Sequence, residues 1–311
     1  MSGLNMTLNN VRVINPILSS VVQGYSDVAN IGSELFPRVA VMQRGGQVIQ
    51  FGKEAFKLYS TLRAPGSDTK RIQFGYAGKP FSINNHAIES IVPREWLQDA
   101  AQVPHIDLAT KAVSLDFRVL SRELEVEQAK LATDATQYAS THVQITADAD
   151  KWTNPASDPI AQLETARETI RSTVGQYPTI VALSAKAWAA LKRHPKITDL
   201  FKYTSASSIT VEMLAARLDL GKVVVGTGVY SDENGNFADI WGTDVVMAYV
   251  PAVISGVEQP SYGYTYTLDG NPLVEEAYWD NGKKSWVYGV TYERTPVIAS
   301  SDSAFLFKAV A

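Results

Sequence analysis

The chain has 311 residues, of which 45% are hydrophobic and 19% charged, with a formal net charge of −4. That length is enough to bury a substantial core in one large or two modest domains, and the charge gives no strong field toward nucleic acid or acidic lipid. The absence of cysteine excludes disulfides, thiolate nucleophiles, zinc–thiolate sites and iron–sulfur clusters. No stretch approaches 18 apolar residues and no basic targeting region opens the chain, so we expect a soluble, cytoplasmic protein.

Residues 1–44 show little helical periodicity, and Pro16 and Pro37 interrupt what there is. One short helix is predicted from Pro16 to Gly24. Apolar side chains with few local partners are spread along the segment: Ile14, Ile17, Leu18, Val21, Val22, Ile31, Leu35 and Phe36. Two interpretations stay open, an arm that packs on another subunit and a segment that folds on its own domain.

Residues 45–92 change to a period of two, typical of strands, around a turn at Ala64–Asp68. The pattern predicts a long hairpin with a polar tip rich in basic residues: Lys53, Lys57, Arg63, Lys70 and Arg71. A free two-stranded ribbon is only marginally stable in water. Either another subunit stabilises this hairpin, or it folds back on its own core. After it, Trp96 and Leu97 are predicted to anchor a linker over residues 93–104.

Residues 106–138 contain no Gly or Pro and are predicted to form one helix, roughly 50 Å long. One apolar stripe recurs in steps of three and four: Ile106, Ala109, Val113, Phe117, Leu120, Leu124, Leu131, Ala135 and Tyr138. A second stripe comprises Leu108, Ala112, Leu115, Val119 and Val126. The charged residues, Asp116 and Glu125 among them, are expected mostly on the remaining surface. The helix is either an ordinary core helix or the spine of an extended subunit.

Residues 157–254 are predicted to form an α/β unit with its own core. Helix starts are indicated at Asp158-Pro159, Ser184 and Thr210, and buried strands at 179–183 and 222–226. A further strand is expected in 141–154. Within the α/β unit a hairpin turn is indicated at 232–235. The last sixty residues are rich in Tyr, Trp and strand patterns, with a further hairpin turn at 281–282.

No constellation in the sequence indicates catalysis. Gly226-Thr-Gly228 lacks the helix that a dinucleotide loop requires, and Asp232-x-Asn234-x-Asn236 is better explained as a tight turn than as a calcium loop. Asn281–Ser285 lies between predicted strands rather than before a helix. The histidines, His86, His105, His142 and His194, form no local pair, and there is no GxSxG. We expect no enzyme, cofactor or metal.

The order of these parts resembles the major capsid proteins of tailed bacteriophages, which share the Hong Kong 97-type fold, and the resemblance covers essentially the whole chain. It is supported by passages similar to that family: Pro178–Pro195, Lys222–Asp232, Ile240–Pro251 and Ser285–Arg294. The resemblance implies an α+β fold with an N-terminal arm (1–44), an extended loop or E-loop (45–92), a peripheral or P domain with the spine helix (93–154), an axial or A domain (155–285) and a C-terminal strand returning to the P domain (286–311).

The implied function is a structural head protein whose hexamers and pentamers form an icosahedral shell around double-stranded DNA. The assembly contacts would involve Lys53, Lys57, Arg63, Lys70, Arg71 and Val119, and DNA would face Arg12, Arg38 and Arg44. Because the arm begins almost at Met1, either a separate scaffolding protein guides assembly or the chain is a processed form, and Met1 favours the scaffolding protein. A portal and a decoration protein are the other partners considered. The expected location is the virion, after assembly in the host cytoplasm and without a membrane. The alternative is an encapsulin-type compartment with the same fold and a protein cargo.

Overall fold

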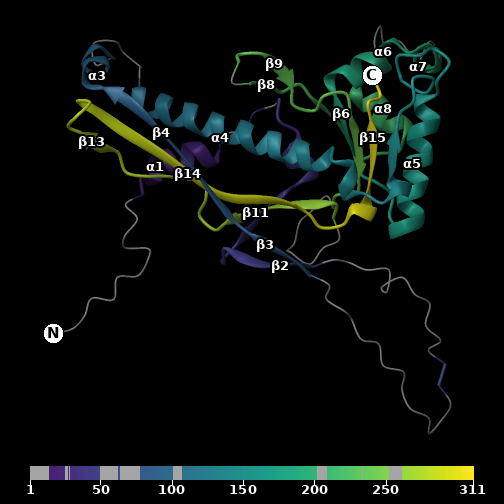
Figure 1. The fold of residues 1–311 in the computed structure, drawn as a ribbon, viewed down its shortest axis with the longest axis horizontal. Coiled ribbons are helices and arrows are strands. Elements are labelled where there is room, and N and C mark those ends of the chain that lie inside the picture. Colours follow the sequence, from purple (N-terminus) through teal and green to yellow (C-terminus); the bar gives the residue numbers. More distant parts are fainter. Residues whose placement is uncertain are drawn as a thin grey trace.

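The computed structural model describes residues 14–24, 27, 29–49, 62–63, 78–100, 107–201, 209–232, 234–251 and 261–311. It confirms a mixed helix and sheet architecture in which two sheets are joined by one long helix, α4 (Figure 1). None of the helices in these ranges is long and apolar enough to span a membrane.

Helix α4 runs from Leu108 to Ala132, about 37 Å at 1.5 Å per residue. Asp107 caps it, its side chain accepting hydrogen bonds from the backbone N–H groups of the first turn. The predicted helix is therefore correct in position but too long at its end. Asp134 accepts a hydrogen bond from Thr136 N and caps a separate 3₁₀ turn, Ala135–Gln137, in place of a continued helix.

The first sheet is organised around the long strand β14 (Ser285–Ile298). The strand order is β1 (Arg38–Val41), β11 (Gly263–Leu268), β14 and β12 (Leu273–Val274). Two further strands, β13 (Tyr278–Asp280) and β4 (Asn84–Pro93), also pair with β14. β14 pairs with β4 over ten residues, from Ser285–Pro93 to Arg294–Asn84. The N-terminal part of α4 packs on this sheet through Val113, Phe117 and Leu120. The hairpin turn predicted at 281–282 lies between β13 and β14, as expected.

The second sheet has the order β5 (Val143–Ile145), β15 (Ala304–Lys308), β10 (Val245–Ala248), β6 (Ile180–Ser184) and β7 (Lys222–Gly226). One face carries the core formed with α5 (Pro159–Val174), α6 (Ala185–Arg193), α7 (Pro195–Phe201) and α8 (Val211–Arg217). The other face packs on Ala129 and Ala132 at the end of α4. The predicted caps Asp158, Ser184 and Thr210 all accept the expected hydrogen bonds. Helix α7 was not predicted.

The C-terminal segment 286–311 divides between the two sheets. β14 packs against α4, as expected for a strand that returns to the helix. β15 instead lies between β5 and β10 in the second sheet. Its apolar run explains this position, because Phe305 and Phe307 face the helices while Ala304 and Leu306 face α4. A strand buried on both faces has no polar side to turn toward water.

The described part of the N-terminal segment packs on its own chain. Helix α1 (Pro16–Gln23) buries Leu18 and Val22 against α4, and α2 (Gly32–Leu35) is buried beside the second sheet. Ile17 points away and is exposed. For these residues the interpretation of a segment folded on its own domain is the correct one.

The base of the predicted hairpin is present. β2 (Gly45–Ile49) pairs antiparallel with β3 (Gly78–Ser82), and Phe81 stacks on Tyr266 of the first sheet at a centroid distance of 4.3 Å. Helix α3 (Arg94–Ala100) occupies part of the predicted linker. Leu97 packs on the α4 core, whereas Trp96 is exposed, so the expected Trp96 anchor is wrong.

The chain also forms a small hairpin from β8 (Val229–Ser231) and β9 (Phe237–Asp239).

Candidate assembly surfaces

The second apolar stripe of α4 is exposed only in part. Leu115 and Val119, one helical turn apart, are 57% and 41% exposed, whereas Ala112 of the same stripe is buried. Leu120, on the other stripe, is 3% exposed and lies in the core with the first sheet. Adjacent residues thus face opposite environments. The exposed pair is an apolar surface on a helix whose other side is already packed.

Two charged residues of α4 are buried, which corrects the expectation that the charges cover its surface. Asp116 accepts a hydrogen bond from the Ser90 hydroxyl of β4, and burial raises the pKa of its carboxyl above the ordinary value. Glu125 lies at the junction of three segments. A helical pattern assigns a residue to a face but does not show what polar group that face meets.

The Glu125 carboxylate accepts hydrogen bonds from Ile31 N at 2.8 Å, Gly32 N at 2.9 Å and Trp241 Nε1 at 2.7 Å. A Cβ at Gly32 would lie 2.2 Å from Gln128 Oε1, so the close approach requires glycine. Burial raises the pKa of Glu125, and the three hydrogen bonds partly offset that rise. The junction holds α4, the N-terminal segment and the α/β unit in one arrangement.

A second polar network joins α4 to β14. The Arg294 side chain is 0% exposed and pairs with Glu127 and with Glu123, the latter at 3.4 Å. His86 Nδ1 of β4 lies 3.3 Å from Glu123, so the sequence-based view of His86 as isolated is wrong. His86, Glu123 and Glu127 offer oxygen and nitrogen atoms within 4.8 Å of one another. Because the Arg294 guanidinium already binds both carboxylates, we interpret the cluster as an ion-pair network.

The predicted DNA-facing residues that the structure describes make contacts within the chain. Arg44 binds Glu293 through two hydrogen bonds, at 2.6 and 3.0 Å, while its own side chain stays largely exposed. Arg38 donates to the Asn271 carbonyl oxygen. Arg12 lies outside the described residues. The structure therefore leaves the guanidinium of Arg44 partly accessible to a further anion.

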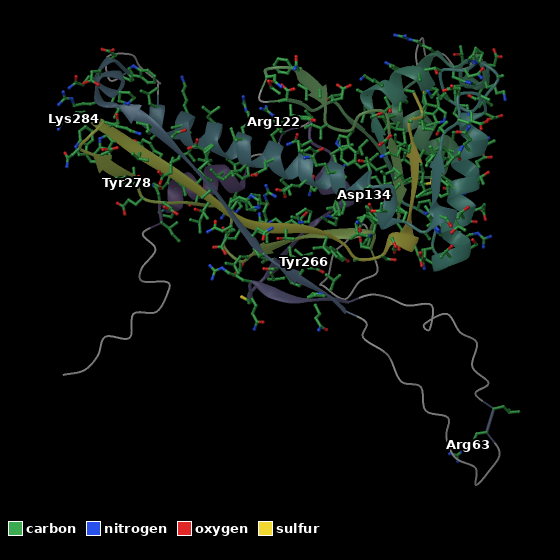
Figure 2. All side chains as sticks on the ribbon, in the orientation of Figure 1. Arg63, Arg122, Asp134, Tyr266, Tyr278 and Lys284 are labelled. Atoms are coloured by element: carbon green, nitrogen blue, oxygen red, sulfur yellow. The ribbon has the colours of Figure 1, made fainter. Side chains whose placement is uncertain are left out.

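Of the predicted basic contacts of the hairpin, only Arg63 is described. It is exposed and lies well away from the two sheets (Figure 2). The others, Lys53, Lys57, Lys70 and Arg71, lie outside the described residues. Their role stays a prediction.

The motifs that were set aside as sites for chemistry have structural roles. β7 is followed by β8 rather than by a helix, and Asp232 Oδ1 accepts hydrogen bonds from Asn234 N and Asn236 N in a tight turn.

Ser157 Oγ lies 3.2 Å from His194 Nε2, a pair that sequence analysis missed. His194 Nδ1 has no hydrogen-bond partner among the described residues, so nothing orients this pair as a catalytic triad requires.

Comparison with known proteins gives consistent relatives. Residues 132–261 match the family model described as phage major capsid protein E. The chain is 31% identical to the major capsid protein of Burkholderia phage BcepMu over 308 residues, covering 97% of this chain and 98% of that one. It is 45% identical to a phage-related protein of Bordetella bronchiseptica RB50, whose crystal structure superposes with a TM-score of 0.83 over 96% of this chain and 98% of that chain.

More distant structures share the fold alone. The capsid of the cyanophage P-SCSP1u has a TM-score of 0.57 at 10% identity, covering 92% of this chain and 89% of that chain. The SrpI encapsulin of Synechococcus elongatus PCC 7942 has a TM-score of 0.55 at 13% identity, covering 99% and 91%. The Burkholderia phage capsid protein and the phage-related protein of Bordetella bronchiseptica each align with nearly the whole chain, and the major capsid protein family is structural rather than catalytic. The chain belongs to the family of phage major capsid proteins.

Proposed function

We propose that this chain is the repeating subunit of an icosahedral head with the Hong Kong 97-type fold, which encloses double-stranded DNA. In this proposal residues 1–44 are the arm, 45–92 the E-loop, 93–154 the P domain, 155–285 the A domain and 286–311 the closing segment. The observation that carries the proposal is the exposed Leu115–Val119 pair, an apolar surface with no role in the subunit's own core. A closed shell would bury such a surface in every copy.

The neighbouring segment we assign to that surface is the hairpin beyond β2 and β3. Its base, the β2–β3 pair, is held on the first sheet where Phe81 stacks on Tyr266, and in this proposal the rest of the loop lies across another subunit. The basic residues of the loop, Lys53, Lys57, Arg63, Lys70 and Arg71, would supply polar contacts around the apolar centre. Main-chain pairing between subunits would add hydrogen bonds.

The partners we propose are a separate scaffolding protein, a portal and a decoration protein, with assembly in the host cytoplasm. Packaged DNA would meet Arg12, Arg38 and Arg44 through weak contacts to phosphates that do not depend on sequence. The exposed guanidinium of Arg44 is compatible with such a contact while Glu293 holds it in place.

Electron microscopy of the full chain, expressed alone and with the adjacent head genes, tests the proposal. Closed shells with pentameric and hexameric units support it. A stable monomer that never assembles in the presence of the scaffolding protein contradicts it. Shells that form without phage genes and enclose a protein cargo would instead support the compartment alternative, and a neighbouring portal or terminase gene argues for the phage head.

A further inference from the structure

The β8–β9 hairpin carries an exposed aromatic side chain. Phe237 of β9 is 78% exposed, the largest exposed fraction of any aromatic residue in the described parts of the chain. Val229, on the paired strand, is also exposed. The hairpin sequence from Val229 to Asp239 contains three acidic residues and no basic one. It therefore presents an apolar side chain on an acidic loop.

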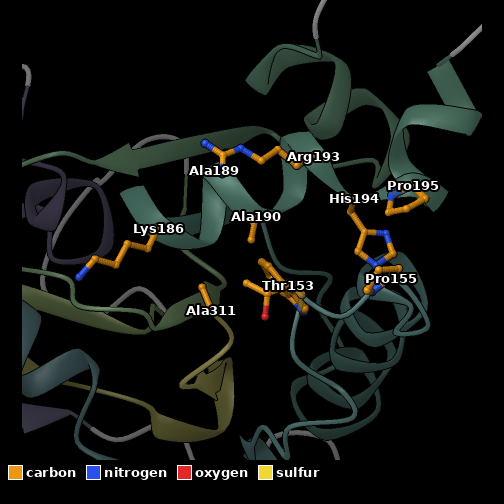
Figure 3. Close-up of a pocket in the computed structure, with 10 residues that line it drawn as sticks. Thr153, Pro155, Lys186, Ala189, Ala190, Arg193, His194, Pro195 and Ala311 are labelled. Atoms are coloured by element: carbon orange, nitrogen blue, oxygen red, sulfur yellow. The ribbon is translucent and has the colours of Figure 1, made fainter.

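The α/β unit also has a groove beside α6 whose apolar lining and basic residues complement the apolar side chain and acidic residues of the hairpin. The groove has a volume of about 550 Å³ and its lining is mainly apolar, with two basic side chains at its margin, Lys186 and Arg193 (Figure 3). The apolar part comes from Trp152, Pro155, Ala189, Ala190 and Pro195, and Ala311 also lines it. Arg193 is exposed and makes no ion pair with the residues that the structure describes.

The hairpin does not fill the groove of its own chain. Asp239, at the end of β9, pairs with Lys186 at 3.0 Å, which places the base of the hairpin at one end of the groove while Phe237 stays exposed. Figure 1 shows the hairpin on the side of α6 that faces α4, with α7 on the other side. An exposed apolar residue and a complementary groove at different places on one surface are the elements of a head-to-tail contact, which closes into a ring when the rotation allows.

We infer that Phe237 of one copy docks into the α6 groove of the adjacent copy, with the acidic turn at Asp232 facing Arg193. The inference rests on the proposed shell, because a head-to-tail ring is the assembly that presents the groove to a second copy. It assigns the hairpin and the groove to the contact between A domains within one pentamer or hexamer. Phe237 supplies the apolar area and the opposite charges set the orientation.

Cross-linking tests the contact directly, because the chain has no cysteine of its own. Phe237→Cys and Ala189→Cys are made as separate variants and co-assembled under oxidising conditions. We expect a disulfide-linked dimer of the two variants in shells, since the Cβ atoms of a disulfide lie about 3.5–4.5 Å apart. As a matched control, Ala161→Cys on the exposed face of α5 should give no link with Phe237→Cys. A double variant that links only within one chain would contradict docking between copies.

A second measurement does not depend on disulfide geometry. Phe237→Asp should raise the protein concentration needed for assembly at least about tenfold. Phe237→Leu keeps an apolar side chain and should assemble at nearly the same concentration as the parent chain. Ala238→Asp places the same charge on the other face of β9 and should assemble like the parent chain. If the parent forms shells and Phe237→Asp assembles as readily as Ala238→Asp, with no cross-link, the inference is wrong and the proposed function stands. If the parent chain forms no shells, the proposed function and the docking of Phe237 are both wrong.

Discussion

The indole Nε1 of Trp241 donates a hydrogen bond of 2.7 Å to the Oε1 atom of Glu125. Both residues are buried, and they are 116 positions apart in the chain. The same carboxylate accepts from the backbone at Ile31 and Gly32. One side chain of α4 thereby fixes the N-terminal segment and the α/β unit to this helix. The relative placement of these parts depends on a polar junction as well as on apolar packing.

Glu125→Ala should lower the free energy of unfolding by at least about 3 kcal/mol, because three buried donors lose their acceptor. Trp241→Phe removes one donor to a carboxylate and should cost about 2 kcal/mol. Urea unfolding of the unassembled subunit measures both. A loss below about 0.5 kcal/mol for Glu125→Ala, the range of ordinary surface substitutions, would show that the junction contributes little.

The pH dependence of stability should carry a contribution from Glu125. Burial raises the pKa of this carboxyl in the folded chain above its ordinary 4.5, so the native state binds more protons than the unfolded state between the two values. The stability contributed by Glu125 therefore falls as pH rises from 4.5 through the raised pKa. The difference in unfolding free energy, parent minus Glu125→Gln, should decrease over that range in urea titrations. A constant or increasing difference would contradict the sign.

Charge placed on the two faces of α4 should have different consequences. Leu120→Asp buries a carboxylate in the core and should destabilise the subunit by more than about 3 kcal/mol. Val119→Asp, on the exposed stripe, should change subunit stability by less than about 0.5 kcal/mol yet impair shell assembly. Unfolding curves and sedimentation of assembled particles separate the two effects. If both variants fail at folding alike, the two-face interpretation is wrong.

The Arg294 network should be sensitive to which partner is removed. Glu123→Ala combined with Glu127→Ala leaves a fully buried guanidinium without its carboxylates and should cost about 3–5 kcal/mol. Arg294→Met leaves two carboxylates that reach solvent and should cost less than half as much. Denaturant unfolding of the two variants compares them. Equal losses would indicate that the network acts through packing rather than through charge.

Local signals in the sequence predicted a large part of the fold. The caps at Asp158, Ser184 and Thr210, the buried strand β6 and the turns at 232–235 and 281–282 were predicted correctly, and the start of α4 to within two residues. β7 was predicted correctly as a strand but not as a buried one, because it lies at the edge of the sheet with Val224 and Val225 half-buried. Helices α3 and α7 were missed because the residues before them, Pro93 and His194, are not typical capping residues, unlike Thr210 before the equally short α8. Of the candidate site residues, Val119 was placed on a separate stripe from Leu120 by periodicity alone.

The sequence by itself determined where α4 begins and which of its residues share a face, because capping and a 3.6-residue period act between neighbours in the chain. The tertiary structure alone decided what each face meets. It buried Asp116 and Glu125, brought His86 and Arg294 to the same carboxylate, that of Glu123, and inserted β15 between β5 and β10. These contacts join residues far apart in the chain, so their free energy depends on partners that no local pattern specifies.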